Sequence, residues 1–303
     1  MQTATVKKKR HLEPIIFNTI NTIIMVLVII IMVYPFWNTV AVSFNDAQDS
    51  MRSGITFFPR VFSTYSYETV LKNPLMLTAT VNSVMRTLLA TILGIFVSSM
   101  IAFVLSRPEF LFRKFVTQYF LVTMYVSAGM IPTYFLMKDL KLLNNFWVYV
   151  LPGLISVFNI IVVKSFMQGI PESLIEAAKV DGAGYFRVYL QIILPVCKPV
   201  LATVALWCAV GAWNSWFDTF LYNSGAENLT TLQYEMMKLL SAASNTGKGD
   251  KTLAQAGGAV AQSVTPTSMR AAVTVIASVP ILIVYPFLQK YFVKGVTLGA
   301  VKG

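Results

Sequence analysis

The sequence has few of the residues that a water-soluble enzyme of this size needs. Only 12% of its 303 residues are charged, whereas an average soluble domain carries about 25%. Its single histidine, His11, lies in a basic tail, which leaves none for a metal cluster or a catalytic dyad. The two cysteines, Cys197 and Cys208, form neither a CxxC pair nor a secreted disulfide framework. We expect both to pack as small apolar residues.

The excess of basic residues does not indicate a nucleic-acid partner. The formal net charge is +11, but the lysines and arginines form no patch of the kind that binds phosphate backbones. They lie instead at the ends of hydrophobic runs, a pattern typical of membrane proteins. Because 56% of the residues are hydrophobic, the composition predicts an all-α integral membrane protein embedded in a lipid bilayer.

Apolar runs long enough to cross a bilayer recur along the chain. A span requires about 20 helical residues, since backbone polar groups in lipid must be paired within the segment. Six runs qualify: 15–37, 81–105, 115–137, 146–166, 199–222 and 271–292. Arg86 lies near one end of the second run, where its long side chain is expected to reach the lipid headgroups. Pro132 and Pro152 are expected to kink the third and fourth runs.

The distribution of basic residues predicts the orientation of these spans. Lysines and arginines gather in the N-terminal tail, in the 106–114 turn, around residues 171–195 and at the C-terminus. By the positive-inside rule both termini are expected in the cytoplasm. The resulting division is a tail (1–14), one transmembrane domain (15–293) with outer loops 38–77 and 223–270, and a second tail (294–303).

The second outer loop contains no nucleotide-binding motif. Its stretch 241–263 is rich in small residues and is expected to be mobile at its centre. It contains lysines and glycines but lacks the G-x-x-x-x-G-K-[ST] spacing of a phosphate-binding loop. If this protein uses ATP, another chain must bind it.

A polar segment, residues 171–195, interrupts the apolar sequence between the fourth and fifth runs, and we call it the elbow segment. Pro171 suits the first position of a helix, on which Glu172 and Glu176 lie one turn apart. An apolar stripe is expected from Leu174, Ala177 and Ala178. Asp181-Gly182 should end this helix, with the glycine in a left-handed cap.

A second short helix is expected after this turn, from about Tyr185 to Leu194, ending at Pro195. Its apolar face is expected to consist of Phe186, Tyr189, Leu190 and Ile193. The product is a helix–glycine–helix elbow too short and too polar to span a membrane. From the residues alone it is either an idle amphipathic linker or a docking surface of small residues and a carboxylate.

A family resemblance decides between these alternatives. The pattern E-A-A-x-x-x-G-x(9)-I-x-L-P is matched without a gap by Glu176, Ala177, Ala178, Gly182, Ile192, Leu194 and Pro195. It resembles the membrane subunits of binding-protein-dependent ABC importers. The stretches MIPTYFLMKDLKLLNNFWVYVLPG, IPESLIEAAKVDGAG and AWNSWFDTFLY resemble the carbohydrate branch, and especially the second permease of maltose-type systems and related oligosaccharide permeases.

The resemblance implies a role and a set of partners. The elbow segment would be the coupling helix, seated in a cleft of an ATPase dimer, which binds ATP and Mg. The coupling residues would be Glu172, Glu176, Ala177, Ala178, Asp181 and Gly182. Further partners would be a second permease, an extracytoplasmic solute-binding protein and a carbohydrate substrate. The chain itself would lack a cofactor, would not be an enzyme, and would lie in a bacterial inner or plasma membrane.

The end of the fifth run provides candidates for the substrate path. Aromatic faces stack on sugar rings, and amides and carboxylates bond to hydroxyls. The candidates are Trp213, Asn214, Trp216, Phe217, Asp218 and Tyr222. The alternative is an interfacial aromatic belt, although a carboxylate at membrane depth favours a cavity or a partner. Remaining alternatives for the whole chain are an ion-coupled secondary transporter and an ABC importer permease for a non-sugar solute.

Overall fold

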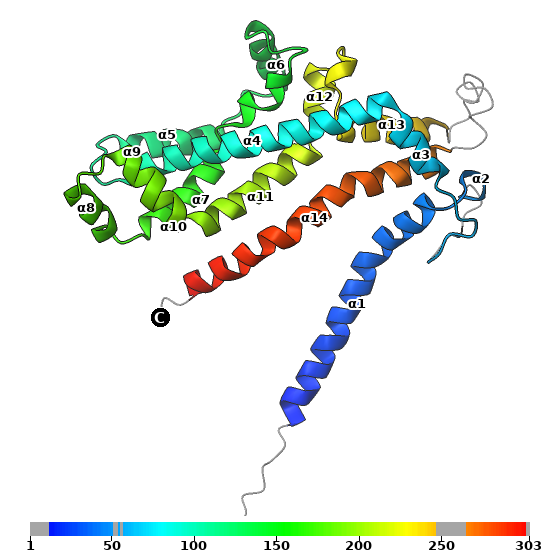
Figure 1. The fold of residues 1–303 in the computed structure, drawn as a ribbon, viewed down its shortest axis with the longest axis horizontal. Coiled ribbons are helices and arrows are strands. Elements are labelled where there is room, and N and C mark those ends of the chain that lie inside the picture. The colour runs from blue at the N-terminus through cyan, green and yellow to red at the C-terminus, as the bar shows by residue number, and fades with distance from the viewer. Residues whose placement is uncertain (1–11, 51–53, 55–56, 247–264, 301–303) are drawn as a thin grey trace, which may run out of the picture. The chain divides into compact units, whose positions relative to one another are not determined.

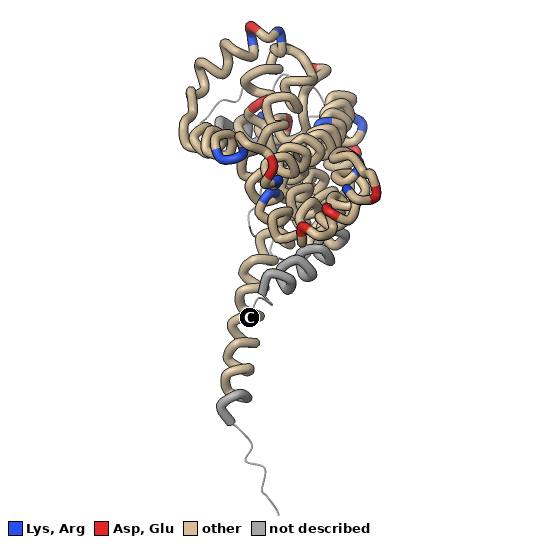
Figure 2. Tube along the Cα trace, turned by 90° about the vertical axis from the view of Figure 1, so that its left-hand side faces the viewer, with Lys and Arg blue, Asp and Glu red and all other residues tan. Residues whose placement is uncertain are grey.

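The computed structural model describes residues 12–50, 54, 57–246 and 265–300 (Figure 1). Helices dominate this part of the chain, and its one isolated β-bridge joins Asn45 to Phe62, which confirms the all-α prediction. His11, most of the predicted N-terminal tail and most of the stretch 241–263 lie outside the described residues. Charged positions are few along the trace, and long uncharged stretches separate them (Figure 2).

The chain divides into two compact units, which are described separately. The first comprises residues 1–67 and 252–275. It contains α1 (Leu12–Ser43), α2 (Ala47–Ser50) and the first part of α14 (Pro266–Ala300). Large apolar side chains of α1 are exposed from Ile16 to Trp37, as expected for a helix surrounded by lipid. The Asn45 carboxamide then fixes the loop after α1, because its Oδ1 accepts from the backbone N–H groups of Arg60 and Val61.

The second unit comprises residues 68–251 and 276–303 and is organised around α4 (Pro74–Ser106). Asn73 caps this helix through a 2.9 Å hydrogen bond from the Leu75 backbone N–H to its Oδ1, and Pro74 occupies the first turn. Small side chains let neighbouring helices approach α4 closely. Its buried small residues include Gly94, Ser98, Ser99 and Ala102. The neighbours are α5 (Arg113–Tyr125), α7 (Val157–Gln168) and α11 (Lys198–Asn214).

Shorter elements connect these helices. α3 (Tyr65–Lys72) leads into α4, and α6 (Met130–Asp139) follows α5. The turns η1 (Phe146–Tyr149) and η2 (Leu151–Gly153) precede α7. α12 (Phe217–Tyr222), η4 (Glu227–Leu229) and α13 (Leu232–Thr246) follow α11. Both cysteines are free; Cys197 lies in the apolar core of this unit and Cys208 packs against that core, as predicted.

The third and fourth apolar runs are both broken. Between α5 and α6 the chain bends by 114°, at residues 126–129, where Gly129 has φ +87°. The prediction of a kink at Pro132 was therefore wrong. Pro132 lies in the first turn of α6, where a helix has no intrahelical partner for an N–H group. The bend of 46° before α7 follows Pro152-Gly153, as expected.

The number of membrane spans depends on how such bends are counted. Three helical stretches qualify on length and apolar character alone: Ile16–Ser43, Pro74–Ser106 and Thr267–Pro286. Three bent pairs qualify when each pair is taken as one span, giving up to six among the described residues. The predicted fifth run, 199–222, is broken after Asn214. The bent pair that contains α11 (Lys198–Asn214) joins it instead to the preceding stretch Tyr185–Val196, with an angle of 82° between them.

Candidate functional site

The first helix of the elbow segment, α8 (Ser173–Val180), exposes most of its surface. Its buried residues are Ile175 and Ala178, which belong to the apolar core of the second unit. The predicted stripe of Leu174, Ala177 and Ala178 was therefore right only for Ala178. Leu174 is 45% exposed and Ala177 is also exposed. The physical reason is that neighbouring apolar residues lie on different sides of the helix. The side of α8 that faces the core carries the β-branched Ile175, and Leu174 lies outside that side.

The exposed face of α8 is acidic and small. Glu172, Glu176, Ala177 and Asp181 are all exposed. Among the described residues none of these three carboxylates forms an ion pair or a side-chain hydrogen bond. Glu172 and Glu176 lie one turn apart, beside a methyl group that permits close approach. The geometry leaves an unpaired acidic surface available to a basic partner.

The turn that ends α8 is fixed by its backbone. Gly182 has φ +78°, the left-handed conformation predicted for it. The Ala183 N–H donates to the Ala178 carbonyl at 2.9 Å, and the Gly182 N–H donates to the Lys179 carbonyl at 3.0 Å. This pair of bonds is the Schellman motif, which satisfies the last carbonyls of the helix. The direction of the chain after α8 is therefore set locally.

The second helix of the elbow segment differs from the prediction. It consists of α9 (Tyr185–Val188), the π-helical turn η3 (Tyr189–Ile193) and α10 (Leu194–Val196), so that Pro195 does not end it. The Leu194 N–H reaches the Tyr189 carbonyl five residues earlier. This wider turn accommodates a proline whose missing N–H and bulky ring would disrupt a regular α-helical turn.

Tyr189 anchors the elbow segment to α4. Its hydroxyl lies 2.8 Å from the Ser99 hydroxyl, and its ring centroid lies 5.4 Å from that of Phe103. The buried face consists of Val188, Tyr189 and Ile193, whereas Phe186 and Leu190, predicted to be part of it, are 61% and 39% exposed. Tyr189 and Ile193 were correctly predicted. α8 and α9 lie at the same end of α4 as the start of α5 (Figure 1).

An exposed ion pair joins α8 to the turn between α4 and α5. Lys179 Nζ lies 2.6 Å from Glu109 Oε1 and 4.7 Å from the centroid of the Tyr185 ring. The hydrogen bond from Lys179 lowers the pKa of Glu109. The same hydrogen bond to Glu109 raises the pKa of Lys179. Both side chains are partly in solvent, so the pair adds orientation to the elbow segment more than stability.

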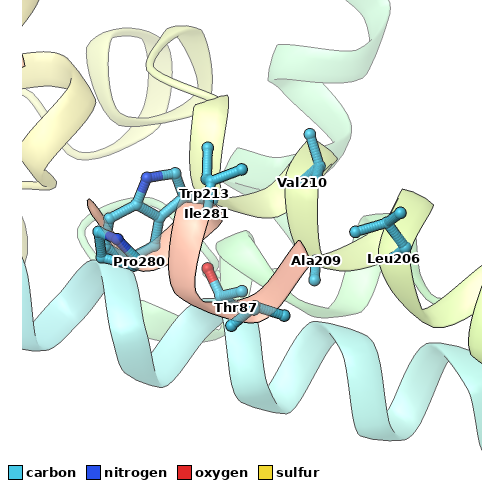
Figure 3. A pocket seen from close by; sticks show the side chains of 8 residues that line it. Thr87, Leu206, Ala209, Val210, Trp213, Pro280 and Ile281 are labelled. Atoms are coloured by element: carbon cyan, nitrogen blue, oxygen red, sulfur yellow. The ribbon is translucent and has the colours of Figure 1, made fainter. Parts of the chain in front are cut away.

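The substrate-path candidates divide into two groups in the structure: two that are held by partners, Trp213 and Asp218, and four that are more accessible. Trp213 is buried, and its indole N–H donates to the Ala277 carbonyl of α14 at 2.9 Å. With Leu206, Val210 and Pro280 it lines an almost entirely apolar cavity of ≈ 70 Å³ (Figure 3). Trp213 thus supports the proline-containing stretch of α14 from α11.

Asp218 is held by an arginine at the break between α11 and α12. Arg86 Nη1 lies 3.1 Å from both carboxylate oxygens of Asp218, and Nη2 donates to the Ser215 carbonyl. The guanidinium also lies over the Tyr149 ring, 5.2 Å from its centroid. The side chain of Arg86 is 1% exposed, so the prediction that it reaches the headgroups was wrong. A buried guanidinium is tolerable here because a carboxylate and a freed carbonyl compensate its charge.

The remaining candidates are more accessible. Asn214 is exposed and accepts a 3.3 Å hydrogen bond from Gln233 Nε2. Trp216 and Phe217 pack edge to face, with ring centroids 5.6 Å apart. Tyr222 stacks on Tyr134 of α6 at 6.2 Å and 13°. These side chains lie around the α11–α12 break, on which both groups converge.

The sequence predictions missed three contacts at these candidate sites. The Arg86–Asp218 pair was signalled by a lone arginine within an apolar run and a lone carboxylate in another. The other two, Tyr189 with Ser99 and Lys179 with Glu109, join residues 90 and 70 positions apart and have no signal in the local sequence.

Comparison with known proteins gives a consistent result. The family model described as the binding-protein-dependent transport system inner membrane component matches residues 12–298. The polygalacturonan/rhamnogalacturonan transport system permease protein YtcP of Bacillus subtilis (strain 168) is 34% identical over 90% of this chain and 94% of its own. Protein LplC of the same organism is 35% identical over 95% of both chains.

A solved structure matches as well. A chain from the crystal structure of a bacterial ABC transporter involved in the import of the acidic polysaccharide alginate is 26% identical to this one. The match covers 96% of this chain and 100% of that chain, with a TM-score of 0.79. The protein therefore belongs to the binding-protein-dependent transport system inner membrane components, as a multi-pass membrane subunit of a transporter.

Proposed function

We propose that this chain forms one half of the translocation pathway of an ATP-driven oligosaccharide importer, and that α8 seats in a cleft of a separate ATPase dimer. The observation that carries the proposal is the acidic face of α8: its carboxylates are exposed and unpaired among the described residues. Exposed carboxylates are common on solvated helices, but Glu176 and Ala177 on this face also belong to the family pattern, which favours a docking surface over an idle linker.

The packing of the elbow segment supports transmission of force. Ile175 and Val188 lie in the same apolar core as residues of α4, α7 and α11, and Tyr189 bonds to Ser99 of α4. Because Gly182 sets the turn through backbone hydrogen bonds, α8 and α9 form a stiff lever. Closure of two ATPase subunits on ATP and Mg would move this lever and shift the spans between inward-open and outward-open packings.

The proposed topology has six spans and both termini in the cytoplasm. Three long helical stretches, two bent pairs and α11 of the third pair supply the spans. The other arm of the third pair belongs to the elbow segment, which shares the cytoplasmic side with the basic 106–114 turn. A second permease would complete the pathway, and a solute-binding protein would dock on the outer loops.

The proposed cargo is an acidic oligosaccharide. Two similar proteins support this choice: one is named for polygalacturonan and rhamnogalacturonan transport, and the other belongs to an alginate importer. Within this chain we assign Asn214, Trp216, Phe217 and Tyr222 to the wall of the path. Trp213 and Asp218 would hold that wall in position.

The decisive experiment separates ATP hydrolysis from uptake in proteoliposomes that contain the complete complex. Glu176→Lys should leave the subunit in the complex but reduce uptake by more than about tenfold, because a charge reversal at a desolvated ion pair costs several kcal/mol. Asp139→Lys, at the exposed end of α6, is the matched control and should transport normally.

Three results would overturn the proposal. Uptake by Glu176→Lys at the wild-type rate would exclude coupling through this face. Uptake that persists without the ATPase would favour an ion-coupled transporter. Uptake of a non-sugar solute in place of oligosaccharides would exclude the cargo assignment.

A further inference from the structure

Three cationic side chains line one open pocket at the end of the second unit that carries the elbow segment. The pocket, which we call the basic pocket, has a volume of ≈ 370 Å³ and lies between the start of α5 and the end of α7. Its lining consists of Leu105, Arg113, Lys114, Thr117, Gln118, Lys164 and Gln168. None of these residues belongs to the coupling surface or to the candidate substrate path.

The charges in the basic pocket are uncompensated. Lys164 Nζ donates to Thr117 Oγ1 at 2.8 Å, but no carboxylate of the described residues pairs with Arg113, Lys114 or Lys164. Like charges in a shared pocket repel one another, and a bound anion would remove that repulsion. Gln118 and Gln168 add neutral amide donors, which suit the oxygens of a phosphate group.

The face of α5 that lines the pocket becomes apolar toward its C-terminal end. One to two turns beyond Thr117 on this face lie Leu121, Met124 and Tyr125, which are 37%, 48% and 83% exposed. No residue of α5 is buried. A polar, cationic pocket continued by an exposed apolar strip matches a ligand that has an anionic head and a hydrocarbon tail.

The position of the pocket identifies the source of such a ligand. Arg113 and Lys114 begin α5 directly after the turn at residues 107–112, and Gln168 ends α7 directly before the elbow segment. In the topology proposed above, on which this inference rests, that level is the inner surface of the membrane. Basic pockets between spans at this surface bind anionic phospholipid headgroups.

We propose that the basic pocket binds the phosphate headgroup of an anionic phospholipid of the inner leaflet, with an acyl chain along Leu121 and Met124. Arg113 and Lys164 contact the phosphate oxygens, and Gln118 bonds to the headgroup. The bound lipid neutralises the start of α5 next to the elbow segment.

The test counts bound lipid on the intact transporter. The complex is reconstituted in nanodiscs of equal parts phosphatidylglycerol and phosphatidylcholine, extracted, and analysed by native mass spectrometry. Since each cation near an anionic surface contributes about fivefold in binding, Arg113→Gln/Lys164→Gln should reduce retained phosphatidylglycerol about 25-fold. Lys164→Arg should retain it, as should Lys198→Gln, which removes an exposed cation at the start of α11.

Competition identifies the ligand. Inorganic phosphate, glycerol 3-phosphate or an oligogalacturonate that displaces the lipid at millimolar concentration would overturn the lipid assignment and point to a soluble anion or to cargo. Equal retention by the double variant and the wild type would exclude the pocket. A double variant that loses the lipid but transports normally would support the site. A wild-type complex that transports but shows no preference for phosphatidylglycerol would overturn the lipid site and leave the proposed function standing.

Discussion

Two interruptions of the apolar sequence are held in opposite ways. The turn at Gly182 is fixed by backbone hydrogen bonds and leaves its neighbouring carboxylates exposed. The break after Asn214 is fixed by side chains, with the Arg86 guanidinium on Asp218 and on the Ser215 carbonyl. A backbone-fixed turn keeps its side chains free for a partner. A break closed by an ion pair uses its side chains to hold itself together.

The largest effect is expected at the side-chain-fixed break. Arg86→Met should lower the free energy of unfolding by about 3–5 kcal/mol, because Asp218 loses its partner and the Ser215 carbonyl loses its donor. Arg86→Met/Asp218→Leu should lose clearly less, since no uncompensated charge remains. Unfolding of the full chain in mixed micelles measures both. Equal losses in the two variants would show that packing, and not charge, holds the break.

A smaller effect is expected at the backbone-fixed turn. Gly182→Ala should destabilise the elbow segment by about 1–2 kcal/mol, because an alanine side chain opposes the left-handed conformation. Gly184→Ala is a matched control: both glycines have open space where the Cβ of an alanine would lie, but Gly184 has φ −70°. Hydrogen exchange of α8 reports the local loss. If both variants exchange alike, the positive φ of Gly182 is not what fixes the turn.

The smallest effect is expected from the exposed ion pair beside the turn. Because Lys179 lowers the pKa of Glu109, the pair stabilises the fold above the unfolded pKa of glutamate, about 4.3, and this contribution is lost as pH falls through the lowered value. On the alkaline side it is lost as pH rises through the raised pKa of Lys179. The difference in melting temperature between wild type and Glu109→Gln should be constant near neutral pH and vanish in acid. A difference that persists at a pH below the lowered pKa of Glu109, where the carboxyl is protonated in both the folded and the unfolded state, would contradict the assignment.

The helical class and the left-handed Gly182 were predictable from the sequence because both depend on local properties. Apolar length predicts spans, and only glycine takes a positive φ without cost. The side of α8 that packs inward was not predictable, since choosing Ile175 over Leu174 requires the shape of the core. The break at residues 126–129 was also missed: Pro132 gave the stronger local signal, but at a helix start it disturbs nothing.

The candidate site shows the same division. The exposure of Glu176 agrees with the docking role that the motif implies, whereas Ala177, expected in the apolar stripe, is exposed. The burial of Arg86 could not be predicted in this way. An arginine near the end of an apolar run can either reach the lipid headgroups or be buried beside a carboxylate, and the local sequence is similar in both cases. Only the position of Asp218, 132 residues later, makes burial favourable. The sequence did not predict contacts between residues that are far apart along the chain.

The indole N–H of Trp213 has a consequence for how the spans can move. It donates to the Ala277 carbonyl, three residues before Pro280, and so ties α11 to the proline-containing part of α14. Separating α11 from this part of α14 would leave the buried indole N–H without its acceptor, at a cost of about 2 kcal/mol. The pathway therefore opens most easily if α11 and this part of α14 move together as one rigid body, with the rearrangement confined to other helix contacts.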